Sequence, residues 1–279
     1  MKQPIKPVAI LKYKEKQFLS LDDLVVSEEP LELRLLFDVD GLLQEKSMAV
    51  TMRTPNADYE LALGFLLTEG IIRNTKEIEK VFHCPQVPPE AQGNVLKIVL
   101  KKGIVPQLVS SERHLYMSSS CGICGKASLE QVNLHCSRAI VFEERISPTV
   151  VCNLSDQLAN TQLLFRHTGG LHAAAIFDAQ GNLLCLKEDI GRHNAVDKVV
   201  GELYSKKINP DHKILFLSGR AGFELVQKAA LAGLGMVVAV GAPSSLAVEL
   251  AQRMNITLIG FSRGHSFNIY SHAERLKRE

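Results

Sequence analysis

The sequence predicts an α/β protein in which a small N-terminal α+β domain precedes a larger domain of parallel β-α units. In the first third, two strand-like segments are followed by a mostly apolar helical segment. In the second half, short apolar segments alternate with helical ones, which is typical of parallel strands joined by crossover helices. A stretch rich in serine, glycine and cysteine, residues 118–125, separates the two parts.

Local signals define the elements of the first third. An Asp-Gly pair, Asp40 and Gly41, predicts a hairpin turn between two strands. The helix expected over residues 56–69 ends at Gly70, which suits a C-cap. Just before it, residues 53–55 (Arg-Thr-Pro) either bind an anion or form a plain helix-entry turn. The strands are expected at residues 31–37, 47–52 and 94–101.

The second half alternates strands and helices, and each strand ends in a turn of small or hydroxyl-bearing residues. We expect strands at residues 213–217, 236–240 and 256–260. We expect helices at residues 221–232 and 244–254. The turn residues are Ser218, Gly219 and Arg220 after the first strand, Gly241, Ala242, Pro243 and Ser244 after the second, and Phe261, Ser262, Arg263 and Gly264 after the third.

These turns predict a ligand site at one edge of the sheet. In open parallel sheets, ligands bind at the carboxyl ends of the strands, where helix N-termini and free backbone N–H groups meet. Arg220 and Arg263 can each hold a phosphate with two hydrogen bonds. A nucleotide or pyrophosphate ligand is therefore predicted. The alternative is that glycine and serine only make the tight turns that any α/β sheet needs.

A dense polar stretch lies between the cysteine pair and the predicted parallel strands. Residues 174–177 and 183–187 read as a hairpin, with His172 just before it and Asp189 just after it. Together with His193, these side chains suit either a metal site or acid–base chemistry. His193 also begins an amphipathic helix, so a capping role is the alternative.

Cys121 and Cys124 form a C-x-x-C pair in which each cysteine is followed by glycine. Lys126 and the first turns of an expected helix follow, and both favour the thiolate form of a nearby cysteine. Three interpretations fit this spacing: half of a zinc site, a dithiol–disulfide redox pair, or a carrier that holds sulfur as a persulfide. The spacing alone leaves all three open.

Composition restricts the setting. The 279 residues carry a formal charge of +2, so no broad electrostatic footprint for nucleic acid is present. The N-terminus lacks the apolar stretch of a signal peptide, and no apolar run reaches the length of a membrane span. Six cysteines without an export signal indicate a reducing compartment, and we expect a cytoplasmic protein.

Six ordered motifs resemble the formate dehydrogenase accessory sulfurtransferases, the FdhD family. The similarity runs from about residue 33 to about residue 270 of this chain. Motifs in this order make coincidence improbable. They read MRTPNADYELALGFLLTEGII (52–72), SSCGICG (119–125), HTGGLHAA (167–174), EDIGRHNAVDK (188–198), SGRAGFE (218–224) and GAPSSLA (241–247).

The resemblance implies a sulfur carrier. It takes persulfide sulfur from a cysteine desulfurase and passes it to the bis(molybdopterin guanine dinucleotide) cofactor of molybdenum or tungsten, for formate dehydrogenase. Cys121 then carries the persulfide, and Cys124 either assists delivery or closes a disulfide that releases sulfide. GDP should mimic part of the cofactor, and the ring of Phe261 could stack on guanine. The implied cofactor site adds Ser262, Arg263, Gly264, His265, Ser266, His172 and His193.

The resemblance also implies a cytidine-deaminase-like, three-layer C-terminal domain and a homodimer. We expect an N-terminal domain over residues 1–117, the cysteine loop and its helix over 118–143, and the cofactor-binding domain over 144–279. Deamination itself is not expected, because zinc deaminases need H-x-E and His172 is followed by two alanines. The alternative is a structural zinc protein that uses Cys121, Cys124 and His172.

Overall fold

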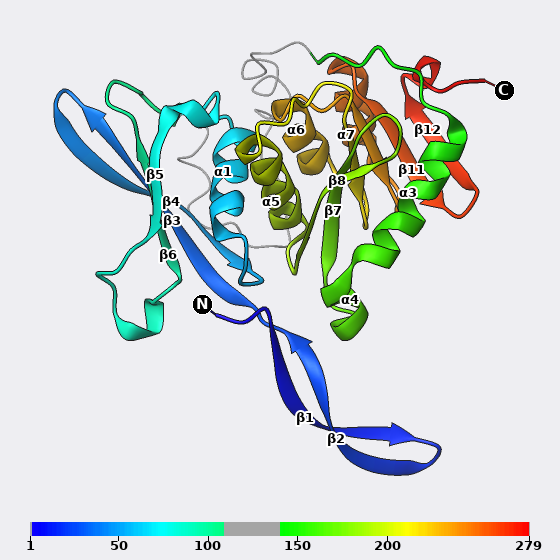
Figure 1. Ribbon diagram of the computed structural model, residues 1–279, viewed down its shortest axis with the longest axis horizontal. Coiled ribbons are helices and arrows are strands. Elements are labelled where there is room, and N and C mark those ends of the chain that lie inside the picture. Colours follow the sequence, from blue (N-terminus) through cyan, green and yellow to red (C-terminus); the bar gives the residue numbers. More distant parts are fainter. Residues whose placement is uncertain (1, 109–139, 279) are drawn as a thin grey trace.

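The computed structural model describes residues 2–108 and 140–278, which form three β-sheets and the helices between them (Figure 1). A two-stranded ribbon pairs β1 (Ile5–Lys14) with β2 (Gln17–Val26). A four-stranded sheet has the order β4 (Leu42–Arg53), β3 (Glu29–Val39), β6 (Val95–Leu100) and β5 (Ile78–His83). A six-stranded sheet has the order β12 (Ser266–Ser271), β11 (Thr257–Arg263), β10 (Met236–Ala239), β9 (Ile214–Leu217), β7 (His172–Phe177) and β8 (Leu183–Asp189).

The helices pack between and beside the two larger sheets. They are α1 (Asp58–Thr68), α3 (Pro148–Thr161), α4 (Leu163–Thr168), α5 (Arg192–Ser205), α6 (Phe223–Leu231) and α7 (Ser245–Arg253). Short 3-10 turns occur at η1 (Thr75–Glu77), η2 (Pro89–Ala91) and η4 (Ala273–Arg275). Across the described residues, no helix is both long and apolar enough to span a membrane.

The four-stranded sheet confirms the predicted hairpin. Asp40 and Gly41 both have positive φ, 53° and 82°, as a two-residue hairpin turn requires. The Asp38 carboxylate accepts the Gly41 N–H at 3.0 Å. The strand β3 pairs antiparallel with β4 and parallel with β6, which places it inside the sheet. Leu31, on β3, is fully buried against the helix layer.

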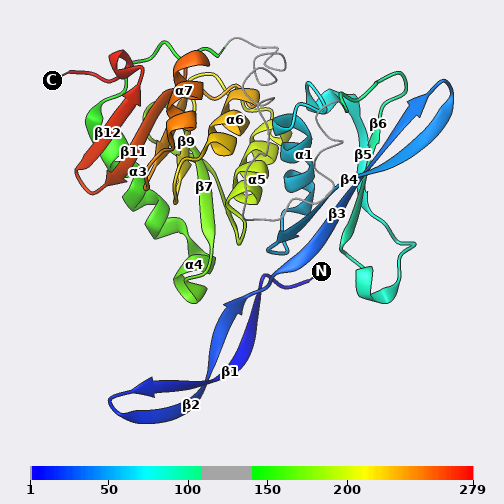
Figure 2. The same cartoon turned by 180° about the vertical axis from the view of Figure 1, so that it is seen from behind.

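Helix α1 follows β4 and joins this sheet to the rest of the molecule. It ends where the sequence predicts, because Gly70 takes a left-handed φ of 67° and donates its N–H to the Leu67 carbonyl at 3.1 Å. Helix α1 packs on α5, and α5 in turn covers one face of the six-stranded sheet (Figures 1 and 2). One hydrophobic cluster, which includes Leu31 and Leu215, runs through all of these layers.

The six-stranded sheet confirms the predicted parallel units and extends them. Strands β9, β10 and β11 are parallel, whereas β7, β8 and β12 pair antiparallel with their neighbours, so the sheet is mixed. Side chains of β7 alternate between the faces: Ala174 and Ile176 belong to the cluster under α5, and Ala173 and Phe177 belong to a second cluster under α3. This part of the chain is therefore a three-layer α/β/α arrangement (Figure 2).

Several strands are longer than predicted: β4 begins at Leu42, and His172 and Asp189 lie within β7 and β8 rather than just outside them. The sequence predicts that the third parallel strand ends at residue 260, but β11 continues to Arg263 and turns directly into β12. The continuation is irregular, because the pairing shifts between Gly260 and Arg263 and Phe261 has a positive φ of 53°. Such a bulge reverses which side chains face inward, and it buries Ser262 while exposing Phe261.

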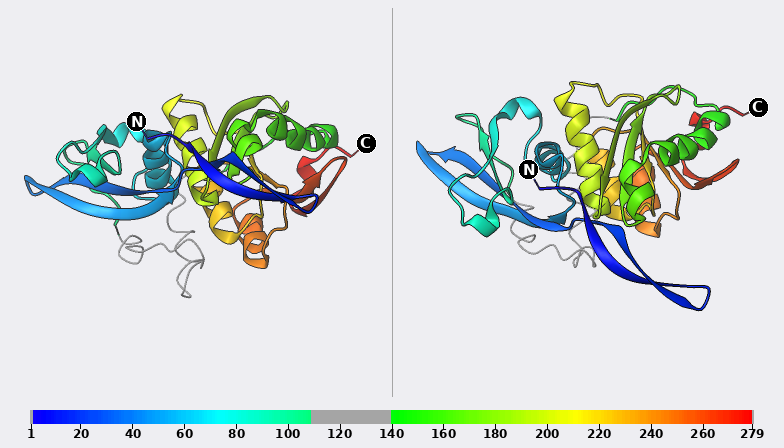
Figure 3. Two further views of the ribbon diagram at one scale, coloured as in Figure 1. Left: turned by 90° about the horizontal axis from the view of Figure 1, so that it is seen from below. Right: turned by 60° about the horizontal axis from the view of Figure 1, so that its bottom comes forward.

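The ribbon of β1 and β2 projects from the body as an arm (Figures 1 and 3). It carries exposed apolar side chains along its length, including Leu11, Tyr13 and Phe18. Tyr13 and Phe18 are paired residues of one face, with ring centroids 5.1 Å apart. The base of the arm contacts α4 through β2.

Candidate functional site

A cavity of about 660 Å³ opens where β9 and β11 end, opposite α3 and α4. Its position fits the rule that ligands bind at the carboxyl ends of parallel strands. Several of the predicted site residues meet there. They are His172, Ser218, Gly219, Ser262, Arg263 and Gly264.

The wall at the strand ends offers hydroxyl groups to a ligand. Ser218 Oγ accepts the backbone N–H of Ala173 at 2.8 Å, which leaves the serine hydrogen free to donate into the cavity. Gly219 lies against the imidazole of His172, because a Cβ added to Gly219 would be 3.5 Å from Nδ1. Burial lowers the pKa of His172, and the nearby Arg192 lowers it further. Both effects favour the neutral imidazole, in which one ring nitrogen donates a hydrogen bond and the other accepts one.

Ser262 is the strongest indication that the cavity binds a polar group. Its side chain is buried, at 1% exposure, and its Oγ has no hydrogen-bond partner among the described residues. An unpaired buried hydroxyl costs about 1–3 kcal/mol. The Phe261 bulge that points Ser262 inward adds further strain, and such strain gathers at functional sites. A bound group that pairs with the hydroxyl would offset the first of these costs.

Arg263 and Gly264 complete this wall at the turn from β11 to β12. Arg263 pairs with Ser266 across the turn, and Gly264 has a positive φ of 54°. Arg263 is exposed and its guanidinium can reach an anion at the cavity mouth. His265 and Ser266 are exposed in the same turn and do not line the cavity.

The opposite wall comes from α3 and α4, and the sequence predicted none of the residues that line it. It consists of Ser155, Asp156, Leu158, Ala159, Gln162 and Phe165. The carboxylate of Glu188, on β8, accepts the N–H groups of Leu164 at 3.0 Å and Phe165 at 2.8 Å. These bonds satisfy the first free N–H groups of α4 and fix the position of Phe165.

Other predicted ligand-binding residues lie outside the cavity and stabilise the turns instead. Ser244 caps α7, because its Oγ accepts the Ala247 N–H at 3.3 Å. The carbonyl of Ala242 accepts the Ala221 N–H at 3.2 Å, which ties two strand-end turns together. Arg220, Gly241, Pro243 and Phe261 also do not line the cavity.

His193 contacts Glu224, away from the cavity lining. Its Nε2 lies 2.5 Å from Glu224 Oε2. The hydrogen bond from His193 lowers the pKa of Glu224. This contact links the start of α5 to α6, so His193 and His172 act in different places.

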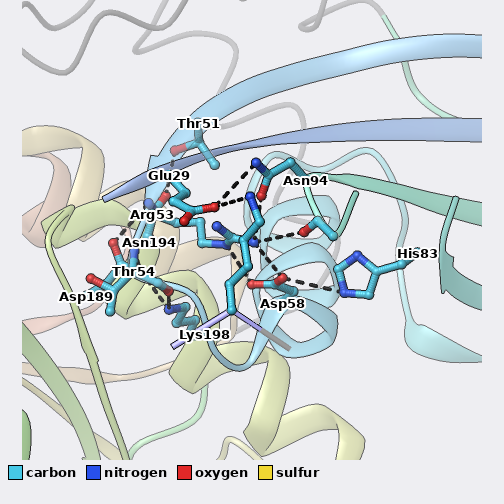
Figure 4. Close-up of polar contacts among 12 residues, drawn as sticks. Glu29, Thr51, Arg53, Thr54, Asp58, His83, Asn94, Asp189, Asn194 and Lys198 are labelled. Atoms are coloured by element: carbon cyan, nitrogen blue, oxygen red, sulfur yellow. Dashed lines mark hydrogen bonds and ion pairs between the residues drawn. The ribbon is translucent and has the colours of Figure 1, made fainter. Parts of the chain in front are cut away.

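Asp189 belongs to a buried network at the junction of the two larger sheets (Figure 4). Its Oδ2 lies 2.6 Å from Lys198 Nζ and accepts the Thr54 N–H at 3.1 Å. Its Oδ1 accepts the Gly191 N–H at 2.8 Å and the Asn194 amide at 3.1 Å. With both oxygens engaged and no exposed surface, Asp189 holds the junction together.

Arg53 forms an ion pair with Asp58, the first residue of the helix that it precedes. Its Nε and Nη2 donate to the two carboxylate oxygens of Asp58 at 2.8 and 2.9 Å (Figure 4). Both side chains are buried at the start of α1. Of the two readings of residues 53–55, the structure supports the helix-entry turn. No group of three metal-binding side chains occurs within residues 2–108 and 140–278.

The predicted catalytic residues Cys121 and Cys124 lie outside the described residues. The chain on either side of them is well anchored. Gln107 donates its N–H to the Ile71 carbonyl at 3.1 Å, on the side of the four-stranded sheet. The Ile140 carbonyl accepts the Asn255 amide at 3.4 Å, just beyond α7.

Comparison with known proteins places these features in one family. Residues 28–277 match the sequence model of the FdhD/NarQ family. The chain belongs to this family. Proteins named sulfur carrier protein FdhD are 44% identical in Mycobacterium tuberculosis (93% of this chain, 94% of the relative) and 43% identical in Streptomyces avermitilis (91% and 89%). A third family member, from Sulfurisphaera tokodaii, is 40% identical over 98% of this chain and 99% of its own.

The fold agrees with the family assignment. A crystal structure of a candidate formate dehydrogenase accessory protein from Desulfotalea psychrophila superposes with a TM-score of 0.72. That comparison covers 98% of this chain and 99% of the other, at 20% sequence identity. The mixed α/β architecture with its large sheets is therefore shared along the whole length.

Proposed function

We propose that this protein is a sulfur carrier that delivers sulfur to a nucleotide-bearing metal cofactor held in the cavity. The observation that carries the proposal is the buried hydroxyl of Ser262, which has no partner within residues 2–108 and 140–278 and lies beside Arg263 in a cavity at the strand ends. The relatives' names support the sulfur-carrier role. The substrate proposed is the bis(molybdopterin guanine dinucleotide) cofactor of molybdenum or tungsten, whose diphosphates suit Arg263 and the serine hydroxyls.

The proposed chemistry has two transfers. In the first, the Cys121 thiolate attacks the outer sulfur of a cysteine desulfurase persulfide, and the desulfurase cysteine leaves as a thiolate. In the second, the Cys124 thiolate attacks Cys121 Sγ, which closes a disulfide and releases the outer sulfur as sulfide to the metal. The two cysteines are oxidised as that sulfur is reduced, so a cellular dithiol must reduce the disulfide before the next cycle.

The proposed recipient is formate dehydrogenase, and the proposed assembly is a homodimer. The arm of β1 and β2 is the surface that we assign to the dimer contact. A two-stranded ribbon is marginally stable alone in water, and this one exposes Leu11, Tyr13 and Phe18. Cover by a second copy would stabilise it.

We further propose that the three-layer part of the fold is related to cytidine deaminases but carries no deaminase activity. His172 begins β7, and the two residues after it are buried alanines of the sheet. The glutamate that zinc deaminases place two residues after this histidine is replaced by Ala174. The competing structural-zinc reading needs Cys121 and Cys124 together with His172.

Mass spectrometry after incubation with a cysteine desulfurase and cysteine tests the sulfur-carrier role. We expect a mass increase of one sulfur, about 32 Da, on the peptide that contains Cys121. Cys121→Ser should lose this adduct and keep its melting temperature. Cys152→Ser is the matched control, since Cys152 lies on α3 and should leave the adduct in place. Stoichiometric zinc without any adduct would instead support the structural-zinc protein.

A further inference from the structure

We propose that the α3–α4 wall of the cavity is a base-binding end and that Asp156 selects guanine over other bases. This inference rests on the proposed function, because it concerns the nucleotide end of the same substrate. The two walls differ in chemistry. Arg263 and the serine hydroxyls on one side suit phosphate oxygens, whereas a carboxylate and an aromatic ring lie on the other. A nucleotide can therefore contact both walls favourably in one orientation only, with its phosphates beside Arg263 and its base against α3 and α4.

Phe165 supplies the stacking surface. It lines the cavity and its side chain is 40% exposed, which is a large apolar exposure for a position held by hydrogen bonds on the adjacent backbone. Glu188 holds the first turn of α4 through the N–H groups of Leu164 and Phe165. A base stacked on this ring would cover it, and such stacking tolerates any base. Phe261 lies outside the lining and is not needed for this role.

Asp156 supplies the discrimination. It lies on α3 next to Ser155, is exposed, and makes no hydrogen bond or ion pair with the described part of the chain. An ionised carboxylate only accepts hydrogen bonds. Guanine offers two donors on one edge, N1–H and the 2-amino group, which match two carboxylate oxygens. Adenine presents an unprotonated N1 there, which would repel the carboxylate.

The matching experiment measures the affinities of four diphosphates, GDP, IDP, XDP and ADP, for the full chain and for Asp156→Asn. For the wild type we expect GDP to bind better than IDP, which lacks the 2-amino group, and better than ADP. In Asp156→Asn, the preference for GDP over ADP should fall by about tenfold or more. The affinity for XDP should rise relative to the affinity for GDP, because the asparagine amide can donate a hydrogen bond to the 2-oxo group of xanthine. Glu249→Gln is the control, since Glu249 is exposed on α7 outside the cavity.

The outcomes separate this inference from the proposed function. An unchanged ratio of GDP to ADP affinity in Asp156→Asn would overturn the role of Asp156, while GDP binding that still depends on Arg263 would leave the cofactor site standing. Phe165→Leu should lower the affinity for all four diphosphates by a similar factor, since stacking does not depend on the hydrogen-bonding groups at the edge of the base. Failure of the wild type to bind any of the four would overturn the proposed nucleotide site itself.

Discussion

Gly64 of α1 and Gly201 of α5 lie directly against the backbone of each other's helix. A Cβ added to Gly64 would be 1.8 Å from the carbonyl oxygen of Asp197, and one added to Gly201 would be 1.8 Å from that of Glu60. Neither helix can therefore carry a larger side chain at the crossing. The pair explains how two helices from distant parts of the chain come close enough to share one core.

Gly64→Ala should destabilise the protein. Alanine favours a helix over glycine by about 1 kcal/mol, but a methyl group against backbone forces the helices apart. Overpacking of this kind typically costs about 1–3 kcal/mol, and here backbone must move, so we expect a net loss of about 1–2 kcal/mol. Chemical denaturation measures it. The control is Gly170→Ala, where the added Cβ meets Val26 Cγ2 at an ordinary 3.7 Å. Equal effects of the two changes would contradict the close helix contact.

Asp189→Asn should cost about 3–5 kcal/mol of unfolding free energy, because it leaves the Lys198 ammonium buried without its carboxylate. Adding Lys198→Met removes that charge and should recover part of the loss. Additive losses would show that the two side chains do not interact. For comparison, Glu45→Gln breaks partly exposed ion pairs with Lys97 and Arg34 and should cost about 1 kcal/mol or less.

Arg263→Lys should weaken GDP binding about tenfold or more, equivalent to about 1.4 kcal/mol, because lysine keeps the charge but loses the two-bond grip on phosphate. Persulfide loading should be unchanged, since in the proposed mechanism the acquisition of sulfur requires only Cys121 and the donor. Titration with GDP and mass spectrometry on the same sample measure both. Unchanged affinity would remove Arg263 from the site, and lost loading would mean that the cavity and the cysteines depend on each other.

The dimer contact that we propose for the β1–β2 arm can be tested by changing its exposed aromatic side chains. Replacing both Tyr13 and Phe18 by serine should convert the proposed dimer to a monomer in sedimentation velocity, with the melting temperature of the body little changed. The control replaces Leu42 and Leu43, which are equally exposed at the tip of the β3–β4 hairpin. A dimer that survives the first change and not the second would move the interface away from the arm.

The elements predicted correctly are those marked by short-range signals. The Asp40–Gly41 turn and the Gly70 stop needed only local backbone chemistry. The sequence also contains the signals of α3. Ser147 caps the helix by accepting the Thr149 N–H, and Val151, Leu154 and Leu158 share its buried face. Strands β5 and β12 lie at sheet edges, pair with one strand each (β6 and β11), and carry mostly exposed or half-buried side chains, so their sequences show no regular apolar alternation.

The site was harder to predict because polar clusters of different purpose look alike in sequence. Asp189 and His193 stand in the same motif as candidate ligands, yet packing turns one toward Lys198 and the other toward Glu224. Asp156 and Phe165 belong to no recognisable sequence motif. Only the packing of α3 and α4 against the sheet places them opposite Arg263.

The single core shared by the two larger sheets restricts how this protein can respond to its cargo. Leu31 and Leu215 lie in different sheets but in one continuous apolar cluster, so the sheets cannot swing apart as hinged lobes without exposing it to water. The body should melt in one calorimetric transition, with an m-value that reflects both sheets at once. Occupancy of the cavity should therefore slow amide exchange in β3 as well as in β9, even though no residue of β3 lines the cavity.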